Sequence, residues 1–167
     1  MAIITGDFAT RLSGGASNAV GDASLGGIKS ANAASTALDA LFDLTTATQA
    51  GAGTVEYRCV YLHNSNAADT MTNAVVFMSA NTPLAGTTID IGVGTAAINA
   101  TEQTIANETT APTGVTFSAP STAATGIALG NIPFGQHRSI WARRTVTAGA
   151  TNSANDTYTI GYQCETA

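Results

Sequence analysis

The chain has 167 residues, of which 44% are hydrophobic and only 10% are charged. This length suits one domain of ordinary size plus an extension, and the hydrophobic content excludes a disordered acidic tail. Six basic residues against eleven acidic ones give a net charge of −5, which argues against a nucleic-acid partner. No apolar run approaches the ~20 residues of a membrane helix, and the first residues lack the pattern of a signal peptide. We therefore expect a protein that is made in a cytoplasm and has no membrane partner.

Residues 1–34 are the first distinct segment. Pairs of glycines interrupt a stretch rich in Ala, Ser and Asn, and neither a period of 2 nor one of 3.6 persists there. Such a segment cannot fold alone but can become ordered on binding. We expect an extended N-terminal arm whose isolated apolar side chains, Leu12, Leu25 and Ile28, bind in grooves of neighbouring subunits. The alternative is a frayed tail.

Residues 35–53 are predicted to contain one short helix and a linker. A serine at the start of 35–44 can cap a helix, and Leu38, Leu41 and Phe42 fall on one helical face. We interpret 45–53 as a polar linker that leads into the next segment.

Residues 54–167 change to strands separated by turns. Alternation is clear at both ends of this segment, with Tyr57, Cys59 and Tyr61 on one face of an early strand. About seven short strands at intervals of roughly ten to fifteen residues predict an all-β fold, an antiparallel β-sandwich of immunoglobulin-like or jelly-roll-like type. The expected strands are 54–65, 71–79, 87–93, 103–106, 114–118, 139–146 and 157–164.

A local motif supports the sandwich. Apolar alternation over 127–132 runs into Pro133 and Gly135, and a long strand follows. Proline fixes φ and glycine permits a positive φ, which suits a corner where the chain crosses between two sheets.

The two cysteines, Cys59 and Cys164, leave two interpretations open. They are too few for a zinc site and lack CxxC spacing. Either both are buried thiols, or a disulfide ties the last strand to the first strand of the sandwich. Synthesis in a reducing cytoplasm disfavours the bond.

A search for reactive chemistry finds little. His63 and His137 are the only histidines, and nothing in the spacing of the acidic residues selects a partner for either. Asp39 and Asp43, four residues apart, are interpreted as a solvated helical face. We expect no enzyme activity, no cofactor and no metal site.

The remaining conspicuous side chains suit packing or contact surfaces. Arg138, Arg143 and Arg144 form the one basic cluster, which we interpret as a solvated or interface face. Trp141 and the four tyrosines suit a core or interface anchors, and the alternative is a platform on which a carbohydrate stacks.

Several segments, taken together, resemble small virion proteins of tailed bacteriophages and prophages. The resembling segments are Leu12–Gly15, Ala23–Gly27, Leu41–Asp43, Glu56–Cys59, Gly114–Ser118, Leu129–Pro133, Gly135–Arg138 and Ile140–Val146. The chain departs from the family in having Phe134 where relatives tend to have a second proline, and in having Cys164.

The resemblance implies a structural virion protein, and we expect a capsid decoration (cement) protein on the capsid surface. Its partner would be the major capsid protein, and the protein itself would form a homo-oligomer, for instance a trimer. Two alternatives stay open: a tail, baseplate or fibre-associated protein bound to tail structural proteins, and a carbohydrate-binding adhesion module.

Overall fold

The computed structural model describes residues 2–37, 40–82, 86–151 and 157–166, and within them the chain forms an antiparallel β-sandwich. A four-stranded sheet has the order β1 (Phe8–Leu12), β3 (Thr54–Asn64), β8 (His137–Val146), β5 (Thr87–Val93). A three-stranded sheet has the order β7 (Ile127–Ile132), β4 (Met71–Thr82), β9 (Thr157–Thr166). A ribbon pairs β2 (Gly26–Gly27) with β6 (Glu102–Thr104). The predicted all-β sandwich is confirmed.

The main core lies between the two larger sheets. Even-numbered residues of β3, such as Val60 and Leu62, face residues of β4 and β7 that are almost fully buried. The buried members of this core are Phe42, Val60, Leu62, Met71, Ala74, Val76, Met78, Ile89, Ile91, Leu129, Ile132, Ile140 and Ala142.

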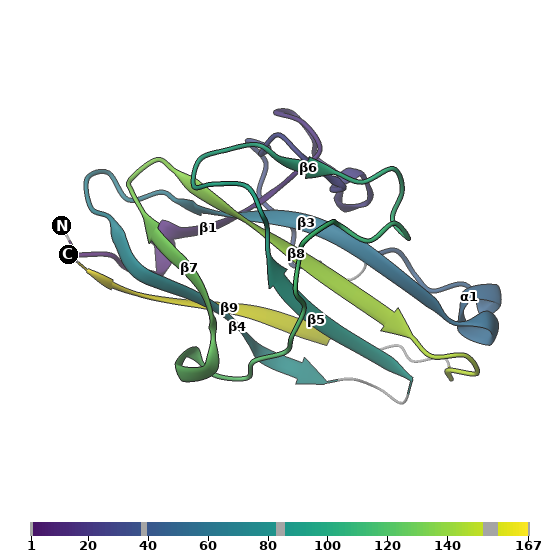
Figure 1. The fold of residues 1–167 in the computed structure, drawn as a ribbon. Helices are drawn as coiled ribbons and strands as arrows, with labels where there is room; N and C mark the ends of the chain where they lie inside the picture. The colour runs from purple at the N-terminus through teal and green to yellow at the C-terminus, as the bar shows by residue number, and fades with distance from the viewer. Residues whose placement is uncertain (1, 38–39, 83–85, 152–156, 167) are drawn as a thin grey trace.

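A second, smaller core covers the opposite face of the four-stranded sheet. Tyr57, Cys59 and Tyr61 of β3 pack there with Trp141 of β8 and with Ile105. The segments around β2 and β6 lie over them, so the molecule has three layers (Figure 1). The predicted grouping of odd-numbered β3 residues on one face is therefore correct, and β3 is buried on both faces.

The expected N-terminal arm belongs to the folded body. Strand β1 pairs with β3 in register from Phe8 opposite Asn64 to Leu12 opposite Val60. The glycines after β1 let the chain turn back and cover the second core. Gly26 has φ +91°, and a Cβ there would lie 1.9 Å from the carbonyl oxygen of Gln103, so the ribbon requires glycine at this position.

The helix lies later in the chain than predicted. The described residues of 35–44 are not helical, and Leu38 and Asp39 lie outside the described residues. Helix α1 (Ala47–Ala52) instead occupies the expected linker. The Thr46 hydroxyl accepts a hydrogen bond from the backbone N–H of Gln49, and the Gln49 side-chain oxygen accepts one from the backbone N–H of Thr46. This reciprocal capping starts the helix there.

Most of the strands predicted from local sequence patterns are present in the structure. The long strands lie close to their predicted positions, whereas 114–118 forms only an isolated bridge between Ser118 and Ile91. The predicted corner is correct: β7 belongs to the three-stranded sheet, β8 to the four-stranded sheet, and Gly135 between them has φ +70°. Three short 3-10 helices lie at Thr5–Asp7, Gly21–Ala23 and Ala123–Thr125.

Candidate functional site

The three residues expected to insert into neighbouring subunits lie in different environments. Leu12 has 2% of its surface exposed, and Leu25 packs against the second core of its own chain. Only Ile28, 54% exposed, is available to a partner. The isolated apolar residues of 1–34 therefore serve mainly to attach this segment to the body, because β3 offers it an unpaired edge and an apolar face.

The two cysteines are free thiols, so the disulfide interpretation is wrong. Cys59 points into the second core, whereas Cys164 of β9 packs against the main core. Strand β3 itself thus separates the two side chains. Burial raises the pKa of Cys59 well above its usual range, and burial also raises the pKa of Cys164.

The hydroxyl group of Ser139 is engaged in a structural contact. Its Oγ donates to Oε2 of Glu102 at 2.5 Å, and both residues are buried. Burial acts to raise the pKa of Glu102, but hydrogen bonds from Ser139 and from the backbone of Ala96 and Gln103 outweigh it and leave the pKa lowered. This carboxylate fastens the β6 ribbon to β8.

Two further findings concern metal and membrane. Within the part of the chain that the structure describes, no group of three or more His, Cys, Asp or Glu residues is placed to hold a metal ion. Among the same residues, no helix has the length and apolar character needed to cross a membrane.

All three clustered arginines are bound within the molecule, Arg138 through the backbone carbonyl oxygens of Ala96 and Gly94 and the other two through carboxylates. Arg143 Nη2 lies 2.5 Å from Asp90 Oδ2, directly across from it on β5. Arg144 forms a two-point ion pair with Glu56, directly across from it on β3. The basic cluster predicted to be a solvated or interface face is thus largely internal.

The same ion pairs hold the segment that precedes β3. The ring of Phe42 lies between two guanidinium groups, 5.4 Å from Arg58 and 4.9 Å from Arg144. Arg58 is 1% exposed and pairs with Glu108 at 2.6 Å. The arrangement accounts for Phe42 being 5% exposed in place of lying on a helix surface.

The aromatic residues do not form a platform for a sugar. Trp141 and Tyr61 are fully buried and Tyr57 is 9% exposed, all in the second core. Tyr158 and Tyr162 of β9 point into the main core, and burial raises the pKa of Tyr162 to about 12. The expectation that these side chains are core anchors is correct for this set.

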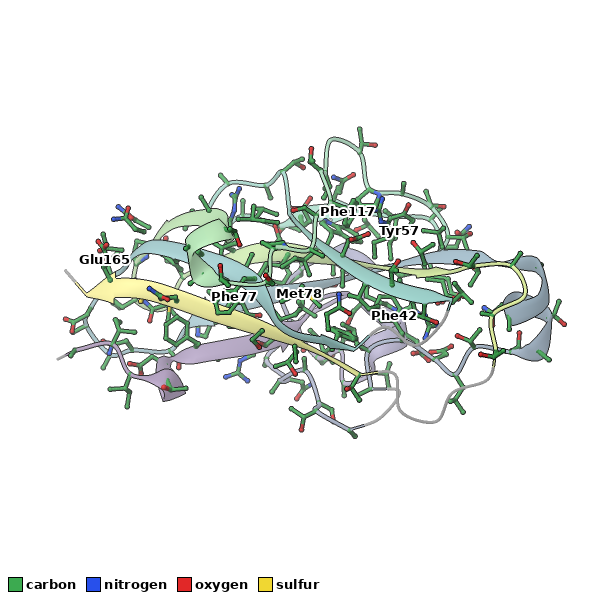
Figure 2. The ribbon with its side chains drawn as sticks, turned by 90° about the horizontal axis from the view of Figure 1, so that it is seen from below. Phe42, Tyr57, Phe77, Met78, Phe117 and Glu165 are labelled. Carbon is green, nitrogen blue, oxygen red and sulfur yellow. The ribbon has the colours of Figure 1, made fainter. Side chains whose placement is uncertain are left out.

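Within the described parts of the chain, one broad face of the sandwich carries no covering layer. The three-stranded sheet turns its outer side to solvent, as Figure 2 shows from that side. Phe77 of β4 lies across Gly161 of β9, where a Cβ would come within 2.7 Å of the ring. The other outward residues described in these three strands are small or polar: Thr72, Asn73, Val75, Ser79, Ala80, Ala128, Gly130, Asn131, Thr157, Thr159, Gln163 and Glu165.

This bare face is almost free of charge. Among its described residues, Glu165 alone bears an ionisable side chain, and its carboxylate accepts a hydrogen bond from the Asn73 amide at 2.9 Å. Glu165 belongs to β9, a ten-residue strand at the edge of this sheet. Among the described strands, β9 pairs only with β4.

A groove runs beside this edge. It has a volume of about 410 Å³ and lies between β9 and the other edge strand on this side, β1. Its floor is held together by the stacked rings of Phe8 and Tyr162, 6.2 Å apart, and by the Thr10 and Tyr162 hydroxyls at 3.1 Å. The lining residues are Thr5, Phe8, Thr10, Ile160, Gly161 and Tyr162.

These features define a class of molecule: an antiparallel sandwich with one covered sheet, one bare sheet of very low charge and a free edge strand. No protein-family model, curated protein or solved structure matches the chain. Sequence alternation already placed Tyr158, Ile160 and Tyr162 on one face of β9, so the outward residues could be read from the same pattern. That nothing covers them could not.

Proposed function

We propose that this protein is a structural component of a tailed-phage virion, namely a capsid decoration protein that binds and stabilises the shell of the major capsid protein. The resemblance of segments spread along the chain to such proteins supports the proposal. The single structural observation that supports it most is the bare, nearly uncharged outer face of the three-stranded sheet.

The two sheets differ in how much of their outer surface is exposed to solvent. The four-stranded sheet is covered by the protein's own second core, whereas the three-stranded sheet offers Phe77, Val75 and many small polar residues to solvent. Removing such a surface from water costs little, because almost no ionised group loses its hydration. The centres of protein interfaces are likewise depleted of charged residues.

A decoration protein can bind through modest contacts. Many copies on one shell act together, so the stabilisation of the particle is a sum over the copies. Closed symmetry such as a trimer would place equivalent faces on neighbouring capsid subunits. The rigid, doubly covered β3 and β8 would hold the binding sheet in a fixed shape.

A matched pair of variants tests this proposal. Thr159→Glu adds a charge at an exposed position of the bare face, on its edge strand β9, and Thr116→Glu adds the same charge at an exposed position of the covering layer. We expect Thr159→Glu to weaken binding to undecorated particles about tenfold, because the added charge loses hydration at the interface, while Thr116→Glu binds normally.

Particle stoichiometry provides a second test. Copies counted on a stained gel of purified virions should be on the order of hundreds per particle, as a closed-symmetry shell requires. A copy number in keeping with a single tail or baseplate ring would refute the capsid assignment, and equal binding by the two glutamate variants would refute the assigned face.

A further inference from the structure

The outer side of the four-stranded sheet carries a group of basic side chains that no ion pair explains. His63 of β3 and His137 of β8 lie directly opposite each other in the sheet register. One step along, Arg11 of β1 is opposite Tyr61, on the same face as His63. Lys29, from the segment that covers this face, completes the group. Burial, and after it the positive charge of Lys29, lowers the pKa of both imidazoles.

The polar atoms of this group are incompletely satisfied. The Nδ1 atoms of both histidines are shut off from solvent and have no hydrogen-bond partner among the described residues. Arg11 and Lys29 reach only backbone carbonyl oxygens, those of Ala31 at 2.7 Å and Ser30 at 3.4 Å. Buried polar atoms normally have partners, so these two nitrogens mark a place on the sheet where the described residues leave polar groups unsatisfied.

The contrast with the other cations is informative. Arg58, Arg143 and Arg144 each have a carboxylate within 4.0 Å, whereas no described carboxylate lies that near Arg11, Lys29 or Arg138, and Arg138 is held by two backbone carbonyl oxygens. A chain with eleven acidic and six basic residues has therefore left two of its few cations beside its only two histidines, without an acid. Gathering like charges costs free energy unless an anion binds among them.

Tyr61 packs against this basic group and holds its parts together. The Tyr61 ring meets the His137 ring edge-on, with centroids 4.9 Å apart, and the Tyr61 hydroxyl donates to the carbonyl of Gly27 at 2.5 Å. Tyr61 thus ties the covering segment that carries Lys29 to the two strands that carry the histidines. The basic groups are held in place by the fold before any ligand arrives.

We propose that His63, His137, Arg11 and Lys29 form a binding site for an oxyanion, a carboxylate or phosphate group. Imidazole N–H, guanidinium and ammonium groups are the donors that such anions prefer. The site is separate from the bare sheet, because it lies on the opposite sheet of the sandwich. It is independent of the proposed decoration function.

The site can be tested on the isolated full-length chain by following the imidazole NMR signals of His63 and His137. Sodium phosphate is titrated in at constant ionic strength, with chloride making up the balance, and sodium acetate forms a second arm. We expect both histidine signals to move together and to saturate with at least one of the two anions. The anion that binds with the higher affinity in these two titrations is the oxyanion that the site fits.

The matched variants are Lys29→Gln and Lys29→Arg. Removing one partly exposed charge near the anion should weaken binding about tenfold, whereas the arginine variant should keep it. Without anion, Lys29→Gln should melt at the same or a higher temperature, because a like charge has been removed. Equal affinity of Lys29→Gln and the unaltered chain, or equal signal movement with chloride alone, would overturn the site.

Discussion

Glu56 and Arg144 stand directly opposite each other on β3 and β8, and Arg144 Nε donates to Glu56 Oε2 at 2.9 Å. The side chain of Glu56 is 2% exposed and that of Arg144 is 11% exposed, so this ion pair is almost entirely inside the protein. The Gln49 amide also donates to Glu56, at 2.8 Å, which ties helix α1 to the sheet. The carboxylate therefore connects three parts of the molecule.

The first prediction concerns the loss of this carboxylate. Glu56→Gln leaves the Arg144 charge buried without a counter-charge, and we expect it to lower the free energy of unfolding by about 3 kcal/mol. Asp90→Asn removes the partner of Arg143 from a pair whose side chains are 33% and 22% exposed, and should cost less than about 1 kcal/mol. Urea unfolding of the two variants measures the difference, and equal losses would contradict the role of burial.

The second prediction concerns residues 1–34. Deleting them removes β1 and much of the layer over the second core, so we expect the remainder to lose cooperative unfolding. The single tryptophan, Trp141, reports this directly, because it lies fully buried under that layer. Its fluorescence should shift to longer wavelength in the truncated chain. Emission and melting like those of the whole chain would mean that the segment is a separate arm after all.

The third prediction concerns pH. Burial, together with the charges of Lys29 and His63, lowers the pKa of His137 from 6.5 to about 4. The folded state thus resists protonation that the unfolded chain accepts. Stability from this residue is fully present above pH 6.5 and is lost progressively as the pH falls towards 4.

Melting temperatures measured across this pH range provide the test. His137→Gln should flatten the dependence between pH 6.5 and 4 relative to the unaltered chain. Acidic residues contribute their own dependence in both proteins, so only the difference between the two curves is assigned to His137. Parallel curves would contradict the assignment.

The fourth prediction concerns the thiols. With no disulfide present, adding a reductant should leave the melting temperature unchanged, whereas removing a real bridge would cost about 2–4 kcal/mol. In the native protein Cys59 should not react with a thiol reagent, because it is fully buried and its pKa is raised. Partly exposed Cys164 should react slowly, and urea should expose two thiols. A single thiol or none in urea would contradict this prediction.

Local sequence patterns predict the long strands of this fold and the corner at Gly135, because alternation and turn chemistry act over a few residues. They do not predict β1, since Phe8–Leu12 gains its stability from β3, more than forty residues later. Likewise, Leu38, Leu41 and Phe42 have helical spacing in the sequence, but Phe42 is held between Arg58 and Arg144, which belong to two later strands. Thr46 followed three residues later by Gln49 is a local sequence signal for the start of a helix, and it marks the start of α1.

The bare face and the basic group likewise depend on both local patterns and contacts between distant segments. The outward residues of β9 can be read from its alternation, but whether another layer covers them depends on the path of the whole chain. The basic group of His63, His137, Arg11 and Lys29 was not foreseen, because its members come from four separate segments. A signal was present, in that His63 alternates with Tyr61 on one face of β3.

Strand β3 is paired on both sides and packed on both faces, whereas among the described strands β9 pairs with β4 alone. Backbone amides in β3 should consequently exchange with deuterated solvent only when the entire molecule unfolds, while those on the open side of β9 exchange by small local openings. The molecule thereby combines a rigid central strand, β3, with an edge strand, β9, whose backbone can adjust to the surface of a partner.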